Sequence, residues 1–155
     1  MASAKRKPTP GELLVLEEFL PYRLSVLSNR VSRAIARRYA KAFDLTIPEW
    51  RVIAVLGRRP GLTAKEVTEA TEMDKVAVSR AVARLVRARR VASRADPEDA
   101  RRQLLALTRE GESLHARIAP IALASEERLL RALDARERMQ LDALIDRLLV
   151  AAKGL

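Results

Sequence analysis

The sequence predicts a mainly α-helical protein with one small two-stranded β-hairpin. The chain has 155 residues, 48% hydrophobic but only 3% aromatic, and it is rich in alanine, leucine and arginine, as expected for a single helical domain with its own core. Helix start signals and helical apolar spacing recur along most of the chain. Residues 91–95 and 104–107 instead read as short strands of Val, Leu and Ala around a polar loop.

The N-terminal third is expected to hold an arm and a long helix. Residues 1–11 combine three basic residues with prolines and a glycine, which indicates a flexible basic arm. A helical region is predicted over residues 12–43, interrupted near Pro21, because leucine, valine and isoleucine follow one side. Thr46 and Glu49 then have the spacing of a capping box, which opens the next helix.

Two capped helices in the middle of the chain predict a helix–turn–helix. Thr63 and Glu66 form a capping box for the first, and Asp74 is placed to cap a second that begins at Lys75. With the hairpin that follows, residues 46–107 are expected to form a winged helix–turn–helix, which puts one helix into the major groove of DNA and the hairpin loop on the adjacent minor groove or backbone. The predicted apolar stripe of the second helix is Val78, Val82, Leu85 and Val86, with Val76, Arg80, Ala83, Arg84 and Arg87 opposite.

Positive charge is concentrated in the same region. Between Lys75 and Arg102 there are nine basic and three acidic residues, which supply six of the chain's ten net positive charges. Such a run can simply be a solvated face, but its coincidence with the turn and the hairpin favours DNA binding. Asp99 is expected to pair with Arg101 and stiffen the loop, which leaves Arg101 itself or Arg102 for a phosphate or the narrow groove.

Three segments resemble the MarR family of bacterial transcription regulators in order and spacing: LTIPEWRVIAVLGRRPGLTAKEV, MDKVAVSRAVARLV and ADPEDARRQLLALTREG. The resemblance covers residues 19–114 position by position. Two departures stand out: Ala77 replaces the usual Thr, and Arg89 and Arg90 replace the usual Gly-Leu, where a left-handed helix end without glycine costs about 1 kcal/mol. The DNA-contacting residues expected from pattern and resemblance are Thr63, Lys75, Ala77, Ser79, Arg80, Arg84, Arg87, Asp99, Arg101 and Arg102.

The helices outside the central region are expected to form a homodimer. Thr108 is predicted to cap a helix bent at Pro120, and Asp134 with Glu137 to cap a last one. One copy is too small to cover all their apolar stripes, so residues 12–43 and 108–155 are predicted to be dimerisation helices, as in the family. The two recognition helices would then face an inverted-repeat operator, one DNA turn or about 34–36 Å apart. The alternative is a monomer with a long helical cap.

The resemblance implies a ligand pocket between the dimerisation helices and the winged domain. Polar side chains cluster early in the first helix, where Arg23 or Arg30 can clamp a carboxylate, and Trp50 can supply a flat wall. A small aromatic effector is therefore expected: a phenolic or hydroxycinnamate-like acid or its coenzyme A thioester. Alternatively, Tyr22 and Trp50 are core or interface residues and the arginines are solvated. The predicted ligand residues are Tyr22, Arg23, Ser25, Ser28, Asn29, Arg30 and Trp50.

Composition and missing motifs exclude several functions. Without cysteine and with one histidine, no disulfide, thiol sensor or zinc site is expected. The sequence has no Gly-rich phosphate loop, GxSxG or HExxH, so we expect no enzyme, catalytic residue, metal or cofactor. No apolar run approaches the ~20 residues that cross a bilayer, so a cytoplasmic protein is expected. The leading hypothesis is a repressor released from its operator by the effector, and the alternative is an architectural DNA-binding protein without a ligand.

Overall fold

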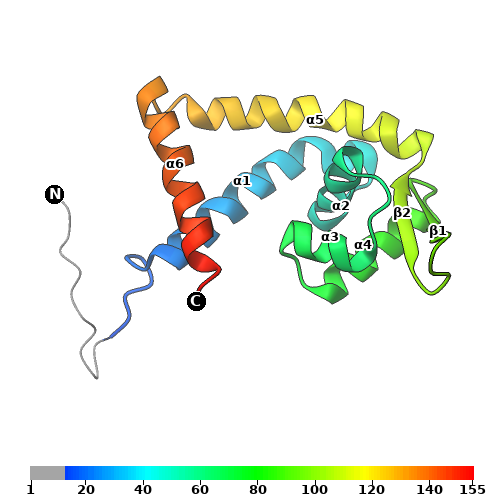
Figure 1. The fold of residues 1–155 in the computed structure, drawn as a ribbon. Coiled ribbons are helices and arrows are strands. Elements are labelled where there is room, and N and C mark those ends of the chain that lie inside the picture. Colours follow the sequence, from blue (N-terminus) through cyan, green and yellow to red (C-terminus); the bar gives the residue numbers. More distant parts are fainter. Residues whose placement is uncertain (1–12) are drawn as a thin grey trace. The chain divides into compact units, whose positions relative to one another are not determined.

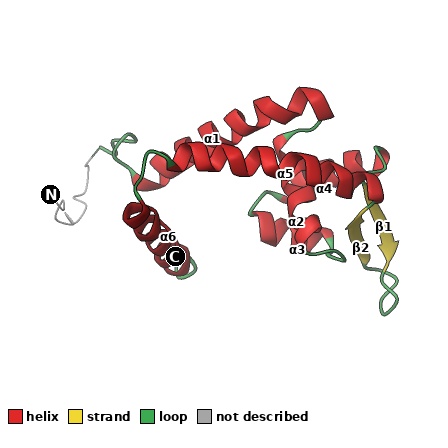
Figure 2. Ribbon diagram, turned by 90° about the horizontal axis from the view of Figure 1, so that it is seen from above, coloured by secondary structure: helices red, strands yellow, loops and turns green. Residues whose placement is uncertain are grey.

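The computed structural model describes residues 13–155, so the arm expected at residues 1–11 lies outside the described residues. The described chain is mainly helical with one two-stranded antiparallel sheet, as predicted (Figures 1 and 2). Its elements are α1 (Leu20–Phe43), α2 (Ile47–Arg58), α3 (Ala64–Thr71), α4 (Lys75–Arg87), β1 (Val91–Ala95), β2 (Gln103–Leu107), α5 (Arg109–Leu130) and α6 (Ala135–Ala152).

Helix α1 begins later than predicted. The structure places its start at Leu20, whereas the apolar pattern suggested residue 12. Pro21 therefore opens the helix instead of interrupting it, because proline lacks the N–H that a first helical turn does not need. The described chain divides after residue 34 into two compact units, and α1 contributes its first part to one and its last part to the other.

The predicted helix caps are present. Thr46, Thr63 and Asp134 each form a reciprocal capping box with the glutamate three residues later. The Asp74 side chain accepts the Ala77 N–H at 2.8 Å, so α4, the helix expected to enter the major groove, begins at Lys75 as predicted. These side chains satisfy N–H groups that have no partner within the helix, which explains why short sequence signals located the helix starts.

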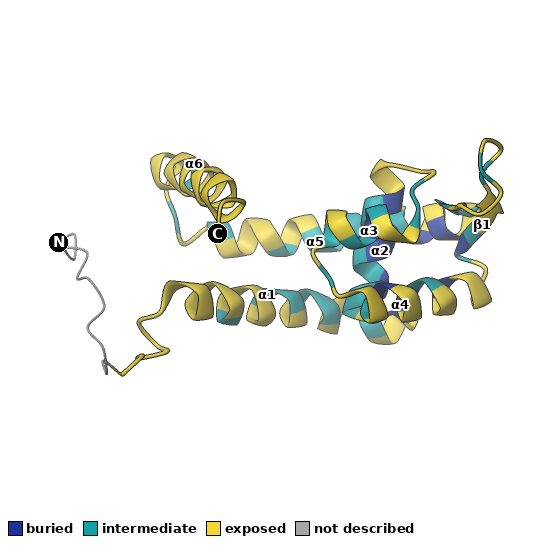
Figure 3. Cartoon of the chain, turned by 60° about the horizontal axis from the view of Figure 1, so that its bottom comes forward, coloured by how far each residue is buried: buried dark blue, intermediate teal, exposed yellow. Residues whose placement is uncertain are grey.

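The core lies among the end of α1, helices α2, α3 and α4, the hairpin and the first half of α5 (Figure 3). Strand β1 pairs with β2 from Val91 opposite Leu107 to Ala95 opposite Gln103. A third short segment, not predicted, joins this sheet: the Gly61 N–H donates to the Leu105 carbonyl and the Leu105 N–H to the Leu62 carbonyl, both at 2.8 Å. The sheet is thereby tied to the helix–turn–helix. The core side chains are Tyr39, Leu45, Val52, Ile53, Leu56, Val67, Val78, Ala81, Leu85, Val91, Leu105, Leu114 and Ile118.

The buried face of α4 is shifted from the predicted stripe. Val78 and Leu85 are buried as expected, but Val86 is 38% exposed and Ala81 is buried in its place. At 3.6 residues per turn, Ala81 and Val86 lie on opposite sides of Leu85. The packed arc is therefore centred closer to Ala81, whose small side chain fits in the core.

The end of α4 keeps the left-handed turn expected in the family although it lacks glycine. Arg89 has φ 57°, its N–H donates to the Val86 carbonyl, and the Arg90 N–H donates to the Leu85 carbonyl, both at 2.9 Å. This pair of bonds is the Schellman motif that glycine usually permits.

Arg89→Gly is expected to raise the free energy of unfolding by about 1 kcal/mol, because glycine adopts a positive φ without the steric cost of a Cβ. Urea denaturation of the purified protein measures this change. Arg87→Gly, only two residues earlier but inside the helix, should lower stability by about 1 kcal/mol. Destabilisation by both substitutions would show that the left-handed turn is not strained.

Candidate nucleic-acid interface

Helix α4 has one face buried in the core and one face exposed to solvent. Val78, Ala81 and Leu85 are buried against the rest of the domain. Ala77 is only partly exposed. The exposed predicted residues of this helix are Lys75, Ser79, Arg80, Arg84 and Arg87.

A hollow of about 440 Å³ lies between the start of α3 and the start of α4. Lys65 and Thr68 of α3 line it together with Lys75 and Ser79 of α4. Lys65 was not among the predicted residues, although its place in the first turn of α3 would have indicated it. The two lysines give this hollow a positive rim that suits a phosphate group.

Thr63 is engaged within its own helix cap. Its N–H and its hydroxyl both donate to Glu66 Oε2 at 2.7 Å, and the hydroxyl accepts the Glu66 N–H at 3.3 Å. The Thr63 backbone and side-chain bonds lower the pKa of Glu66. Thr63 therefore orders the start of α3, the first helix of the helix–turn–helix.

The loop between β1 and β2, here called the wing loop (residues 96–102), projects beyond the helices (Figure 2). The predicted brace is confirmed: Asp99 Oδ1 lies 3.1 Å from both the side-chain Nε and the backbone N of Arg101. The Arg101 side-chain bond, followed by its backbone bond, lowers the pKa of Asp99. The Arg101 side chain nevertheless stays 91% exposed.

A second brace in the wing loop was not predicted. Asp96, whose side chain is only 10% exposed, forms an ion pair with Arg102 in which Oδ2 lies 3.3 Å from Nη1, and the Asp96 N–H donates to the Arg102 carbonyl at 2.9 Å. Arg102 is therefore tied to the base of the loop. Of the two arginines, Arg101 is the more exposed, since the Arg102 side chain is 49% exposed.

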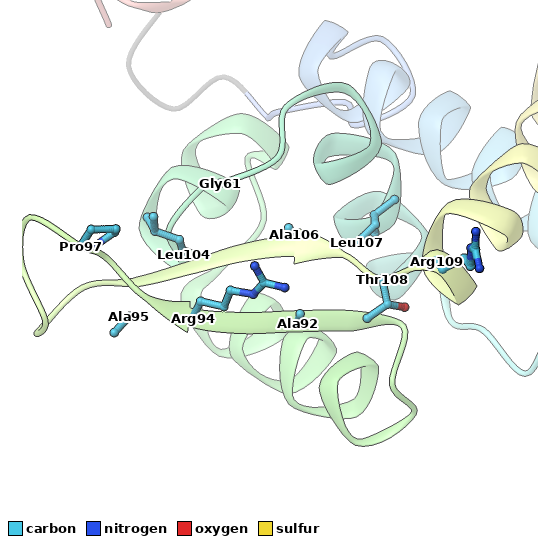
Figure 4. Close-up of a pocket in the computed structure, with 10 residues that line it drawn as sticks. All are labelled: Gly61, Ala92, Arg94, Ala95, Pro97, Leu104, Ala106, Leu107, Thr108 and Arg109. Carbon is cyan, nitrogen blue, oxygen red and sulfur yellow. The ribbon is translucent and has the colours of Figure 1, made fainter.

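One face of the hairpin carries a hollow of about 620 Å³ (Figure 4). Arg94 lies across this face, and alternation along β1 places Ala92 beside it on the same side. Arg94 was not singled out from the sequence, although the strand period would have placed it outside. The hollow is lined by Gly61, Ala92, Arg94, Ala95, Pro97, Leu104, Ala106, Leu107, Thr108 and Arg109.

Arg84, an expected DNA contact, is half exposed and has a partner within the protein. Its Nε lies 3.0 Å from Oε1 of Glu49, which is 2% exposed. The other Glu49 oxygen accepts the N–H and hydroxyl of Thr46 at 2.7 Å. A buried carboxylate needs such compensation, so Arg84 joins α4 to α2.

The residues expected around a ligand fall into two groups. Tyr22, Arg23, Ser25, Ser28, Asn29 and Arg30 all lie on the first part of α1, within residues 1–34. Among them, Asn29 Nδ2 donates to Ser25 Oγ at 3.4 Å, one helical turn earlier.

Trp50 belongs to the other unit and packs against the core. Its ring centroid is 5.9 Å from that of Tyr39 and 5.8 Å from that of His115, which stacks at 26°. Burial raises the pKa of Tyr39 to about 12, which marks the apolar character of this cluster. Trp50 is therefore a partly buried residue that packs against the core.

Comparison with known proteins shows which family the chain belongs to. A sequence model of the MarR family matches residues 43–102, from the end of α1 to the wing loop. The transcriptional regulator HosA of Escherichia coli O111:H- is 32% identical over 95 residues, which cover 61% of this chain and 70% of HosA. The chain belongs to the MarR family. It is a DNA-binding transcriptional regulator of the MarR type and not an enzyme.

Solved MarR-family structures have the same fold. The MarR/EmrR family regulator of Acinetobacter sp. ADP1 superposes with a TM-score of 0.83 at 24% identity, over 92% of this chain and all of that one (100%). The PcaV regulator of Streptomyces coelicolor superposes with a TM-score of 0.71 at 28% identity, over 91% and 99% of the two chains. Within residues 13–155, no helix is long and apolar enough to span a membrane.

Proposed function

We propose that this MarR-family regulator binds an inverted-repeat operator as a homodimer and represses the adjacent genes. The observation that carries the proposal is the division of α4 into a face packed in the core and a face exposing Lys75, Ser79 and Arg80. Such a helix can enter the major groove while its other face stays anchored. A dimer that covers an operator blocks access of RNA polymerase, which makes repression the expected outcome.

Each exposed residue has a role that follows from its chemistry. Ser79 and Arg80 face base edges, and the Ala77 methyl group suits a thymine methyl. The basic residues Lys65, Lys75, Arg87 and Arg94 contact phosphates. Arg101, oriented by Asp99, reaches the narrow groove or the backbone. Arg84, engaged with Glu49, is not part of the proposed interface.

Arg80→Ala is expected to weaken binding to the true operator by about 1–3 kcal/mol while hardly changing affinity for random DNA, because base contacts carry specificity. The operator is obtained by selecting bound fragments from the source genome, and affinities are measured by fluorescence anisotropy at fixed salt. Lys75→Ala is the matched control and should weaken binding to both DNAs. Equal losses for Arg80→Ala on both DNAs would reduce Arg80 to a phosphate contact. Binding by the parent protein that ignores sequence would favour an architectural DNA-binding protein.

The last helix supports the dimer. No residue of α6 is buried within the single chain, although the helix is rich in apolar side chains (Figure 3). A continuous apolar face of this size favours a covering partner, and a second copy related by a two-fold axis covers it symmetrically. The exposed apolar residues of α6 are Met139, Leu141, Leu144, Ile145, Leu148, Leu149 and Val150.

A small aromatic acid is the proposed effector. The polar cluster on the first part of α1 offers hydrogen-bonding groups and, in Arg23 and Arg30, partners for a carboxylate. The structure of PcaV, 28% identical to this chain, was solved with its natural ligand, which supports a small-molecule effector. Such a ligand releases DNA only if it binds the DNA-incompetent state more tightly, so operator DNA must weaken ligand binding by the same factor.

A panel of hydroxybenzoates, hydroxycinnamates and their coenzyme A thioesters, titrated against the labelled operator complex, is expected to contain an inducer. Arg23→Ala, Arg30→Ala and Tyr22→Leu should still bind the operator but lose the response, because the carboxylate and ring contacts are removed. Arg33→Ala, one turn further along α1, is the control and should respond normally. If all variants respond like the parent, the pocket lies elsewhere; if no compound acts, the aromatic-acid effector is wrong.

A further inference from the structure

The side chain of Arg90 reaches the end of α1. Its Nη2 donates to the carbonyl of Phe43 at 2.7 Å and its Nη1 to the carbonyl of Asp44 at 3.1 Å. Asp44 has φ 47°, so the chain turns left-handed there as α1 ends. The terminal carbonyls of a helix lack partners within the helix and carry partial negative charge, so a guanidinium suits this position.

The backbone of Arg90 closes a second helix. Its N–H donates to the Leu85 carbonyl at 2.9 Å, which completes the end of α4. Its carbonyl accepts the N–H of Thr108 at 3.1 Å, just before α5 begins. The neighbouring Arg89 carbonyl accepts the Thr108 hydroxyl at 2.6 Å. One residue thus joins the end of α1, the end of the recognition helix and the start of α5.

A second tie lies nearby on α4. Arg84 pairs with the buried carboxylate of Glu49 and approaches Asp44 at 4.0 Å. Arg84 and Arg90 therefore both contact the segment between α1 and α2 (residues 43–49). Arg84 lies in the C-terminal half of α4, and Arg90 lies just beyond its end. The residues proposed to face base edges, Ser79 and Arg80, lie nearer the N-terminal end of α4.

We infer that Arg90 is a positioning residue: it fixes the position of α4, the proposed recognition helix, relative to the end of α1. Leucine at this position can pack, but it cannot donate to the carbonyls of Phe43 and Asp44. The Arg90 guanidinium therefore provides a polar link between the end of α1 and the turn that ends α4. Operator selectivity depends on Arg90, although its guanidinium is bonded inside the protein and takes no part in the proposed DNA contacts. The DNA part of this inference rests on the proposed function.

The test compares the full-length parent with Arg90→Leu and Arg90→Lys. Arg90→Leu keeps apolar packing and removes the donors, whereas Arg90→Lys keeps a charge that can still reach one carbonyl. Hydrogen exchange followed by mass spectrometry is expected to show lost protection in Arg90→Leu at two places together, the end of α1 and the end of α4, with partial recovery in Arg90→Lys. The preference for operator over random DNA should fall roughly three- to thirty-fold in Arg90→Leu. Lys153→Gln, which removes one charge at the end of α6, should change neither readout.

The outcomes separate this inference from the proposed function. Unchanged exchange at the end of α1 in Arg90→Leu, or a loss confined to α4, overturns the link. An operator preference equal to the parent's overturns the positioning role. If the parent itself shows no sequence preference, the proposed function fails, while hydrogen exchange still decides whether Arg90 joins the helices. If Arg90→Leu does not fold, Arg90→Lys carries the test, and parent-like behaviour in both readouts overturns the inference.

Discussion

Gly111→Ala is expected to destabilise the protein by about 3 kcal/mol or more. A Cβ at Gly111 would lie 2.0 Å from the carbonyl oxygen of Arg90 and 3.1 Å from its carbonyl carbon. Backbone at the end of α4 cannot move aside as a flexible side chain can, and this carbonyl also accepts the Thr108 N–H. Urea denaturation should show a lower midpoint with an unchanged slope.

Two other glycines provide a graded control. A Cβ at Gly57 would meet the His115 ring at 2.8 Å, so Gly57→Ala should cost less, about 1–2 kcal/mol, because a side chain can rotate at the expense of its stacking on Trp50. Gly154→Ala, whose Cβ has no neighbour closer than 3.7 Å, should be within about 0.5 kcal/mol of the parent. If Gly111→Ala is as stable as Gly154→Ala, the close approach of α5 to Arg90 is wrong.

Leu144→Glu combined with Leu148→Glu is expected to separate the proposed dimer. The two leucines are 51% and 46% exposed in the single chain and lie one turn apart on α6. In a leucine-rich interface each carboxylate costs several kcal/mol unless it is protonated. Analytical ultracentrifugation should therefore show a monomer or an unfolded chain, together with a loss of operator binding.

The control for this variant is a charge on the same helix away from the apolar face. Arg136→Glu places a carboxylate in the first turn of α6, where the helix dipole favours it, and should leave the dimer intact. A double-glutamate variant that remains a stable, operator-binding dimer would show that the interface lies elsewhere. Dissociation of both variants would point to charge, not burial, as the cause.

Local chemistry explains which features the sequence determined by itself. The capping boxes at Thr63 and Asp134, the cap at Asp74 and the brace between Asp99 and Arg101 each join groups two or three residues apart. Such contacts need only the local backbone, so residue type and spacing are enough to predict them. The order of helices and strands followed from these signals and from apolar periodicity, whereas the MarR-type fold was expected from the resemblance of three sequence segments.

Only the tertiary structure decided the roles of residues whose partners are distant in the sequence. Helical periodicity placed Arg84 opposite the apolar stripe, but it could not show that Arg84 forms an ion pair with the buried carboxylate of Glu49. Likewise, nothing local indicated that the Arg90 side chain binds carbonyls 46 and 47 residues earlier, or that His115 stacks on Trp50. A periodic pattern defines the face on which a side chain lies, whereas what covers that face depends on how the helices pack.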